Sequence, residues 1–196
     1  MPATTHLLYL HGFRSSPRSA KARMVAERVA RDHPAVTFWC PQLPPSPRQA
    51  MAMVAGGIAG WPRAAMAVIG SSLGGFYAGW VAQRMRCPSV LLNPAVDPAR
   101  DLARYIGEHP VWQSPEERVF FRAEYIDELR ALDVRGEPPA APAFAVIAKG
   151  DEVLDWREMA ARCAHARLRL LDGSNHALDD FASQIDEVFD FLQLAR

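Results

Sequence analysis

Short apolar runs along the chain alternate with longer stretches that have a helical repeat. The short runs are bounded by turn-forming residues, which is typical of buried strands. Six strands are expected, over residues 6–10, 35–40, 65–69, 89–92, 143–148 and 167–171. Because strands that alternate with helices form parallel sheets with both faces covered, the pattern predicts an α/β fold.

Three of the intervening stretches are predicted amphipathic helices, each with one apolar face toward the core. Ser16 is expected to cap the first helix and Pro17 to lie in its first turn. The apolar face of this helix comprises Ala22, Val25, Ala26 and Val29. The second face comprises Trp156, Met159, Ala160 and Cys163. The last comprises Leu178, Phe181, Ile185, Val188, Phe189 and Leu192.

Residues 94–142 interrupt the alternation of strands and helices and are rich in proline and aromatic residues. An insertion of this length between two strands is usually functional. We expect a small helical cap over one end of the sheet, at about residues 97–140, within a single domain of residues 1–196. Helical spacing within the cap is kept by Phe121, Tyr125, Leu129 and Leu132.

Composition narrows the possible classes of protein. The 196 residues include 22 Lys and Arg against 22 Asp and Glu, and 49% are hydrophobic, which is enough for a core and excludes a disordered chain. Zero net charge provides no long-range attraction to nucleic acid or to an anionic membrane. We therefore expect no nucleic-acid partner. Nothing in the sequence indicates the oligomeric state.

Cys40, Cys87 and Cys163 lie far apart and show no metal-binding spacing, which favours reduced thiols. The N-terminus lacks the pattern of a signal peptide, so we expect a cytoplasmic protein. Residues 64–83 carry no charge and are long enough to span a membrane. A turn-like Gly-Ser-Ser-Leu-Gly-Gly cluster at residues 70–75 interrupts them, which favours two buried elements over a membrane span.

The most specific motif is the G-x-S-x-G sequence of residues 70–74, which follows a predicted buried strand and opens a predicted helix. The glycines allow the strand and helix to approach closely, while the hydroxyl of Ser72 points out of the sheet. A glycine-rich turn with an unreactive serine is the alternative. The context favours Ser72 as a catalytic nucleophile.

A serine needs an imidazole to accept its proton and a carboxylate to orient that imidazole. Asp151 follows the fifth predicted strand and His176 follows the sixth, so both lie at the edge of the sheet where Ser72 emerges. We expect His176 to be the general base and Asp151 the orienting acid. Four other carboxylates remain open as alternatives for the acid: Asp97, Glu152, Asp155 and Asp172.

The oxyanion of an acyl-transfer intermediate needs preorganised N–H donors. We expect these to be the backbone amides of Phe13, in the loop after the first strand, and Leu73, at a helix N-terminus. Gly12 lets the first loop bend toward the site. The side chain of His11 is expected to bond the loop backbone, with a catalytic role as the alternative.

Four basic residues follow this loop: Arg14, Arg18, Lys21 and Arg23. One interpretation is a solvated helix face. The other is that Arg14 and Arg18 attract an anionic substrate such as a phosphate-bearing acyl carrier. The remaining histidines form no metal-ligand pattern, and no phosphate-binding or dinucleotide-binding motif is present. We therefore expect no metal and no cofactor.

These residues resemble the α/β-hydrolase superfamily and, more narrowly, the small bacterial YqiA-type esterases. The similarity rests on the segments at residues 8–13, 15–22, 41–45, 70–75, 93–96, 150–155 and 175–177. It implies a minimal six-stranded sheet of order 2-1-3-4-5-6 and hydrolysis of small-molecule acyl esters or thioesters. Ser72, Asp151 and His176 match the catalytic triad of the superfamily.

The sequence therefore predicts a serine esterase or thioesterase that forms an acyl-enzyme intermediate. An acyltransferase with the same triad is one alternative. A catalytically silent binding protein that kept the fold is another.

Overall fold

The computed structural model describes residues 3–195, and its centre is a six-stranded parallel sheet. The strands are β1 (His6–Leu10), β2 (Thr37–Trp39), β3 (Met66–Ser71), β4 (Ser89–Leu92), β7 (Ala143–Ala148) and β8 (Arg167–Leu171). Their order is β2-β1-β3-β4-β7-β8, with every neighbouring pair parallel. Numbered within this sheet alone, that order is the predicted 2-1-3-4-5-6, so the predicted fold is confirmed.

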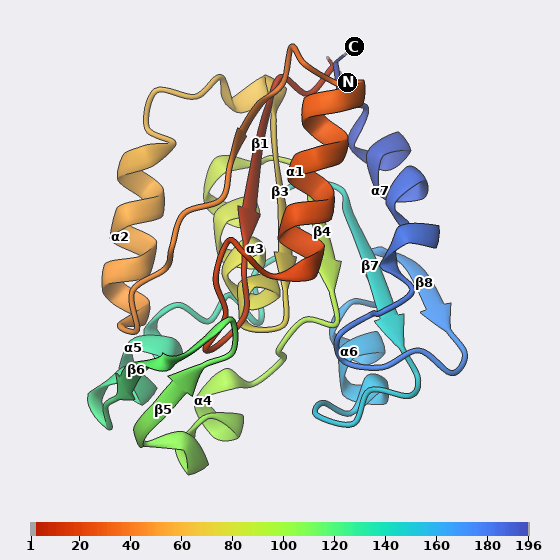
Figure 1. The fold of residues 1–196 in the computed structure, drawn as a ribbon. Helices are drawn as coiled ribbons and strands as arrows, with labels where there is room; N and C mark the ends of the chain where they lie inside the picture. Colours follow the sequence, from red (N-terminus) through yellow and green to blue (C-terminus); the bar gives the residue numbers. More distant parts are fainter. Residues whose placement is uncertain (1–2, 196) are drawn as a thin grey trace.

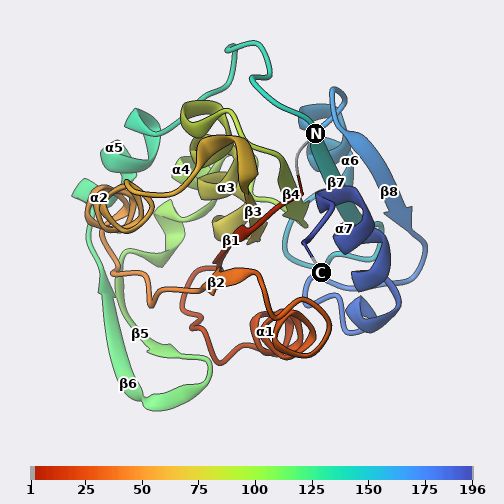
Figure 2. The same cartoon turned by 90° about the horizontal axis from the view of Figure 1, so that it is seen from above.

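Helices cover both faces of the sheet, as Figure 2 shows from above. One face carries α1 (Ala20–Asp32) and α7 (Ile185–Leu192), and the other carries α2 (Pro47–Gly57), α3 (Leu73–Met85) and α6 (Trp156–Arg162). Side chains alternate along β1, so Leu7 and Tyr9 enter one core while Leu8 and Leu10 enter the other. Burial on both sides explains why the strand sequences are almost entirely apolar.

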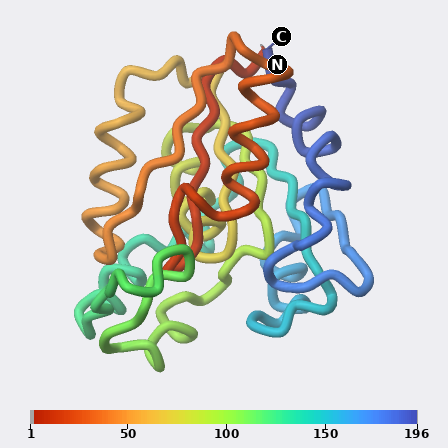
Figure 3. The backbone as a smooth tube through the Cα atoms, in the orientation of Figure 1, coloured from red at the N-terminus to blue at the C-terminus, as the bar shows by residue number. Residues whose placement is uncertain are grey.

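The two ends of the described chain lie together at the amino ends of the strands, where Thr4 and Leu194 form a β-bridge (Figures 1 and 3). The carboxyl ends of the strands point the opposite way, toward the segment between β4 and β7 (Figure 1). In open parallel sheets, ligands bind at this carboxyl edge. The loops that follow β1, β3, β7 and β8 meet there.

The start of the first helix differs from the prediction. Helix α1 begins at Ala20 with Ser19 in the N-cap position, so the predicted cap at Ser16 and the predicted place of Pro17 in the first turn are both wrong. The hydroxyl of Ser16 is engaged elsewhere: it accepts from the Arg18 amide (3.2 Å) and donates to Gln113 (3.1 Å). These contacts hold residues 16–19 in a turn ahead of the helix.

The segment between β4 and β7 contains more than the expected helix. It holds α4 (Pro98–Asp101), a 3₁₀ turn η2 (Ala103–Tyr105), an antiparallel hairpin of β5 (Gly107–Val111) and β6 (Ser114–Phe121), and helix α5 (Glu124–Ala131). The helical spacing that began at Phe121 was misleading, because Phe121 ends β6 and packs edge-on against Tyr125. The hairpin and both helices lie beyond the carboxyl ends of the strands (Figure 1).

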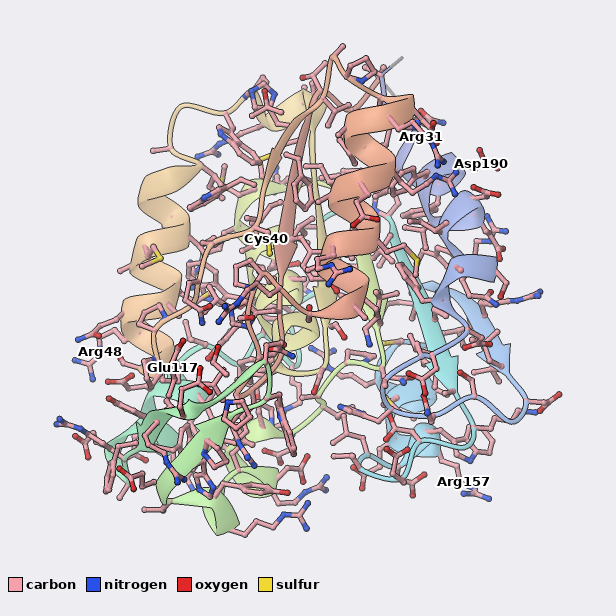
Figure 4. All side chains as sticks on the ribbon, in the orientation of Figure 1. Arg31, Cys40, Arg48, Glu117, Arg157 and Asp190 are labelled. Carbon is pink, nitrogen blue, oxygen red and sulfur yellow. The ribbon has the colours of Figure 1, made fainter. Side chains whose placement is uncertain are left out.

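The apolar face of the last predicted helix is buried, but the helix is interrupted. A 3₁₀ turn, η3 (Phe181–Ser183), precedes α7. Another, η1 (Arg63–Ala65), leads into β3. Charged side chains such as Arg31 and Asp190, on α1 and α7, lie at the periphery (Figure 4).

All three cysteines are free thiols. Cys87 and Cys163 are buried, and Cys40, labelled in Figure 4, is half-buried after β2. The uncharged stretch at residues 64–83 forms β3 and most of α3, joined at Ser72, as the sequence predicted. Within residues 3–195, no helix has the length and apolar character needed to cross a membrane.

Candidate active site

Ser72 lies at the sharp turn between β3 and α3. Its backbone has φ 56° and ψ −121°, a conformation that non-glycine residues rarely adopt. The turn is fixed by hydrogen bonds: the Ser72 amide donates to the carbonyl of Leu92 (2.9 Å), and its carbonyl accepts from the amides of Gly75 (2.8 Å) and Ala95 (3.0 Å). Strain of this kind persists where surrounding structure enforces it, and it clusters at functional sites.

The glycines of the motif are required by packing. A Cβ atom at Gly74 would lie 2.0 Å from the carbonyl oxygen of Leu10 on β1, and one at Gly70 would lie 2.0 Å from the carbonyl oxygen of Gly74. Both distances are far below van der Waals contact. Any side chain at either position would push α3 away from the sheet and move Ser72.

The structure brings Ser72, His176 and Asp151 into one hydrogen-bonded chain. The Ser72 Oγ is 3.1 Å from the His176 Nε2, and the His176 Nδ1 is 2.7 Å from the Asp151 Oδ2. The side chain of Asp151 is fully buried, and its other oxygen accepts from the amides of Val153 and Leu154, both at 2.8 Å. Two backbone donors thus fix the carboxylate while it faces the imidazole.

The other candidate carboxylates are engaged elsewhere. Asp97 caps α4 and pairs with Arg135 (3.2 Å), and Asp155 caps α6. Asp172 pairs with Lys149 at 2.8 Å. The carboxylate of Glu152 accepts from the backbone amide of His176 (3.0 Å), so it supports the histidine loop. Among residues 3–195, Asp151 is the carboxylate hydrogen-bonded to the imidazole.

The loop after β1 passes beside the serine. A Cβ atom at Gly12 would lie 3.2 Å from the Ser72 Cβ and 3.7 Å from its Oγ, so only a small residue fits there without displacing the loop. The amide of Phe13 follows directly, and the amide of Leu73 opens α3. For the part of the chain that the structure describes, neither amide donates to a protein acceptor. Both amides thus belong to segments that adjoin Ser72.

His11 lies beneath this loop and is 4% exposed. Its Nε2 accepts from the amide of Leu43 (3.1 Å), so the ring is protonated at Nδ1, which donates to the carbonyl of Gly12 (3.0 Å). Burial lowers the pKa of His11, consistent with a neutral ring. The side chain therefore bonds the loop backbone.

Arg14 and Arg18 contact the hairpin. The Arg14 Nε donates to the carbonyl of Pro110 (2.9 Å), and its guanidinium stacks on Trp112 at 4.1 Å from the ring centroid. Arg18 donates to the hydroxyl of Ser114 and faces Glu117 at 3.5 Å. Both side chains thus attach β5 and β6 to the segment after β1.

Asn93 is a residue that the sequence analysis did not single out as functional. It is fully buried at the end of β4, with φ 41°. Its side-chain amide donates to the carbonyls of Asn175 (3.0 Å) and His176 (3.2 Å), and its oxygen accepts from the amide of Ala148 (2.8 Å). Asn93 therefore joins the loop of His176 to β7. Asparagine tolerates positive φ, which is the one signal in the sequence that could have indicated it.

A cleft of about 340 Å³ opens above Ser72 and His176. Phe13, Lys21, Trp112 and Gln113 line other parts of it. A second cleft of about 370 Å³ shares the loop at residues 11–13 and is lined by Leu43, Leu73, Tyr77 and Val119, together with Arg14, one of the two arginines that the sequence suggested for substrate binding. Within residues 3–195, no cluster of side chains has the composition of a metal site.

The sequence matches the family described as "Uncharacterised protein family (UPF0227)" over residues 6–193. Among solved structures, the chain is similar to Est1E from Butyrivibrio proteoclasticus, determined with bound ferulic acid (TM-score 0.75, 14% identity, 95% of this chain and 86% of that chain). It is also similar to a structure from work on two metagenome-derived lipolytic enzymes, LipS and LipT (0.75, 19%, 97% and 94%). A third is the enol-lactonase from Burkholderia xenovorans (0.62, 19%, 96% and 91%).

Proposed function

Because the chain belongs to the UPF0227 family and has the fold of the α/β-hydrolase superfamily, we propose that it is a serine hydrolase of carboxylic esters or thioesters. One observation carries this proposal: the chain of hydrogen bonds from Ser72 through His176 to Asp151, at 3.1 and 2.7 Å. Fold alone does not imply an activity, so the proposal depends on this geometry.

Asp151 accepts a hydrogen bond from the protonated Nδ1 of His176, which leaves the Nε2 unprotonated and free to act as a base toward Ser72. As the Ser72 Oγ attacks the acyl carbonyl, the Nε2 takes its proton. The carboxylate of Asp151 then stabilises the imidazolium. The negative oxygen of the tetrahedral intermediate accepts hydrogen bonds from the amides of Phe13 and Leu73.

When the intermediate collapses, His176 gives the proton to the leaving alcohol or thiol, and the acyl group stays on Ser72. Water then enters, His176 takes its proton, and the resulting hydroxide attacks the acyl carbon. The second collapse returns the proton from His176 to Ser72 and releases the carboxylic acid. The chain's own residues supply each of these steps, so the proposal includes no cofactor.

The substrate we propose is a small acyl ester or thioester, without nucleic acid as a partner. Since His176 must protonate the leaving group, the leaving group lies in the cleft that His176 lines. The second cleft, with Leu43, Leu73 and Tyr77, offers an apolar surface for the acyl chain. The similar structures include one from work on lipolytic enzymes and an enol-lactonase, which supports this substrate class. The free thiols of Cys40, Cys87 and Cys163 favour a cytoplasmic location.

Hydrolysis of p-nitrophenyl butyrate between pH 5 and pH 8 tests the proposal. We expect release of nitrophenol and free butyric acid, and loss of both in a His176→Ala variant, because the imidazole takes the proton of Ser72. Absence of hydrolysis for esters and thioesters of every chain length would contradict the proposal. Unchanged turnover by His176→Ala would contradict the role of His176. Transfer of most of the acyl group to an added alcohol would favour an acyltransferase instead.

A further inference from the structure

Lys21 is less exposed than the interpretation of a solvated helix face requires. It is the second residue of α1 and is half-buried. Its Nζ donates to the carbonyl of Ala177, the residue that follows His176, and both residues line the cleft that contains Ser72. A contact between residues 156 positions apart thus connects α1 to the histidine loop.

The position is an unfavourable one for a lysine. The N-terminus of a helix is the positive end of its dipole, so a cation in the first turn is destabilised. Burial lowers the pKa of Lys21 to about 8, while the carboxylates of Asp179 and Asp151 act in the opposite direction. A residue that breaks a local rule in this way is expected at a functional site.

The histidine loop is held from two sides. Asn93, at the end of β4, donates to the carbonyls of Asn175 and His176, and Lys21 donates to the next carbonyl, that of Ala177. Three successive carbonyls therefore accept from side chains of two other elements. These two residues contact the backbone carbonyls of the loop and not the imidazole itself.

Charged and titratable groups from several elements surround Lys21. Asp179 lies on the same loop, where it accepts from the Asn175 side chain (2.8 Å), and Asp151 comes from the loop after β7. His176 lines the cleft with Lys21, and Tyr9 and His11 line it from β1 and the loop that follows. The ammonium of Lys21 therefore interacts electrostatically with Asp151, the hydrogen-bond partner of His176.

We propose that Lys21 is a positioning residue for the reaction described above: together with Asn93 it fixes the loop that holds the His176 imidazole against Ser72. The inference rests on the proposed function. It assigns Lys21 no contact with the reacting atoms. It acts by donating a hydrogen bond to the Ala177 carbonyl and by the positive charge of its ammonium group.

Two variants of the full-length chain test the proposal. Lys21→Met keeps an unbranched side chain without charge or donor, and Lys21→Arg keeps the charge. Arg23→Met is the matched control, since Arg23 lies on the same helix with its side chain 68% exposed. Each variant is assayed with p-nitrophenyl butyrate, a neutral ester, from pH 5 to pH 9.5, and its melting temperature is measured.

We expect Lys21→Met to lower kcat about tenfold with KM within about twofold, because a charge-assisted hydrogen bond that orders the loop is lost. We expect wild type to lose activity above about pH 8, where Lys21, whose pKa burial lowers to about 8, gives up its proton, and Lys21→Met to lack this alkaline limb. Lys21→Arg keeps activity there, and Arg23→Met behaves as wild type.

A profile of Lys21→Met that is lowered uniformly and keeps the alkaline limb of wild type would overturn the proposal in favour of a purely structural role. A loss confined to KM would overturn it in favour of a substrate contact. If Lys21→Met does not fold, the activities of Lys21→Arg and wild type above about pH 8 are compared instead. The same loss of activity in both proteins would overturn the proposal. Proton NMR of the His176 ring gives a readout without turnover: the same ring chemical shifts in wild type and Lys21→Met would overturn the inference, whereas an inactive wild type would overturn the proposed function.

Discussion

Replacing Ser72 by alanine is expected to reduce kcat for p-nitrophenyl butyrate by about 10⁴-fold or more. The hydroxyl oxygen is the atom that becomes acylated, and His176 has no other protein hydroxyl within hydrogen-bonding distance among residues 3–195. The fold should be unaffected, because alanine and serine both carry one Cβ and meet the same strain at φ 56°. The measurement is steady-state kinetics combined with circular dichroism.

Ser183→Ala serves as the control for this variant, since it removes an exposed hydroxyl that donates to the carbonyl of Asp180 and accepts from the side chain of Gln184, with no contact to Ser72 or His176. We expect that control to keep wild-type kcat. Turnover by Ser72→Ala within tenfold of wild type, in protein of the same melting temperature, would rule out Ser72 as the nucleophile.

Asp151→Asn is expected to lower kcat by about 10³-fold to 10⁴-fold. The carbonyl oxygen of asparagine can still accept from the amides of Val153 and Leu154. Its NH₂ group then faces the His176 Nδ1, which stabilises the tautomer with the proton on the Nε2. In that tautomer the nitrogen next to Ser72 cannot accept a proton, so the effect falls on kcat.

Asp155→Asn is the matched control for the carboxylate, because Asp155 lies four residues further on and caps α6 by accepting from the amide of Arg157. Asparagine is also a good N-cap residue, so this variant should keep both fold and kcat. An equal loss in both variants would contradict the assignment of Asp151 as the orienting acid.

The strands were predictable because the sheet is covered on both faces. β4, β7 and β8 have the bounds that the sequence indicated, and β1 does as well. Continuous apolar runs between turn residues leave few alternatives for such strands. The approximate positions of Ser72, Asp151 and His176 followed from the same reasoning, since each comes directly after a predicted strand.

The hairpin of β5 and β6 was not predictable in this way. β6 carries three consecutive charged residues, Glu116, Glu117 and Arg118, and β5 contains Pro110 next to an irregularity in the pairing. Contacts with Arg14 and Arg18, almost a hundred residues away in the sequence, hold the hairpin in place. The local sequence pattern contains no information on such contacts. For the same reason, the sequence did not show that the two arginines bind the hairpin.

The roles of Asn93 and Lys21 were hidden for the same reason. Their partners lie in the histidine loop, 82 or more residues further along the chain. A buried asparagine and a lysine on an amphipathic helix have no distinctive local signature. Only the folded chain shows that both donate to successive carbonyls around His176.

The central claim is that His176 and Ser72 share a proton, so that the hydroxyl oxygen is a nucleophile. Its most direct test is reaction with a fluorophosphonate, followed by mass spectrometry of the intact protein and of its peptides. We predict one phosphonyl group per chain, attached to Ser72, and no labelling of a folded His176→Ala variant. Absence of labelling in the wild type, attachment to another residue, or equal labelling of His176→Ala would contradict the claim.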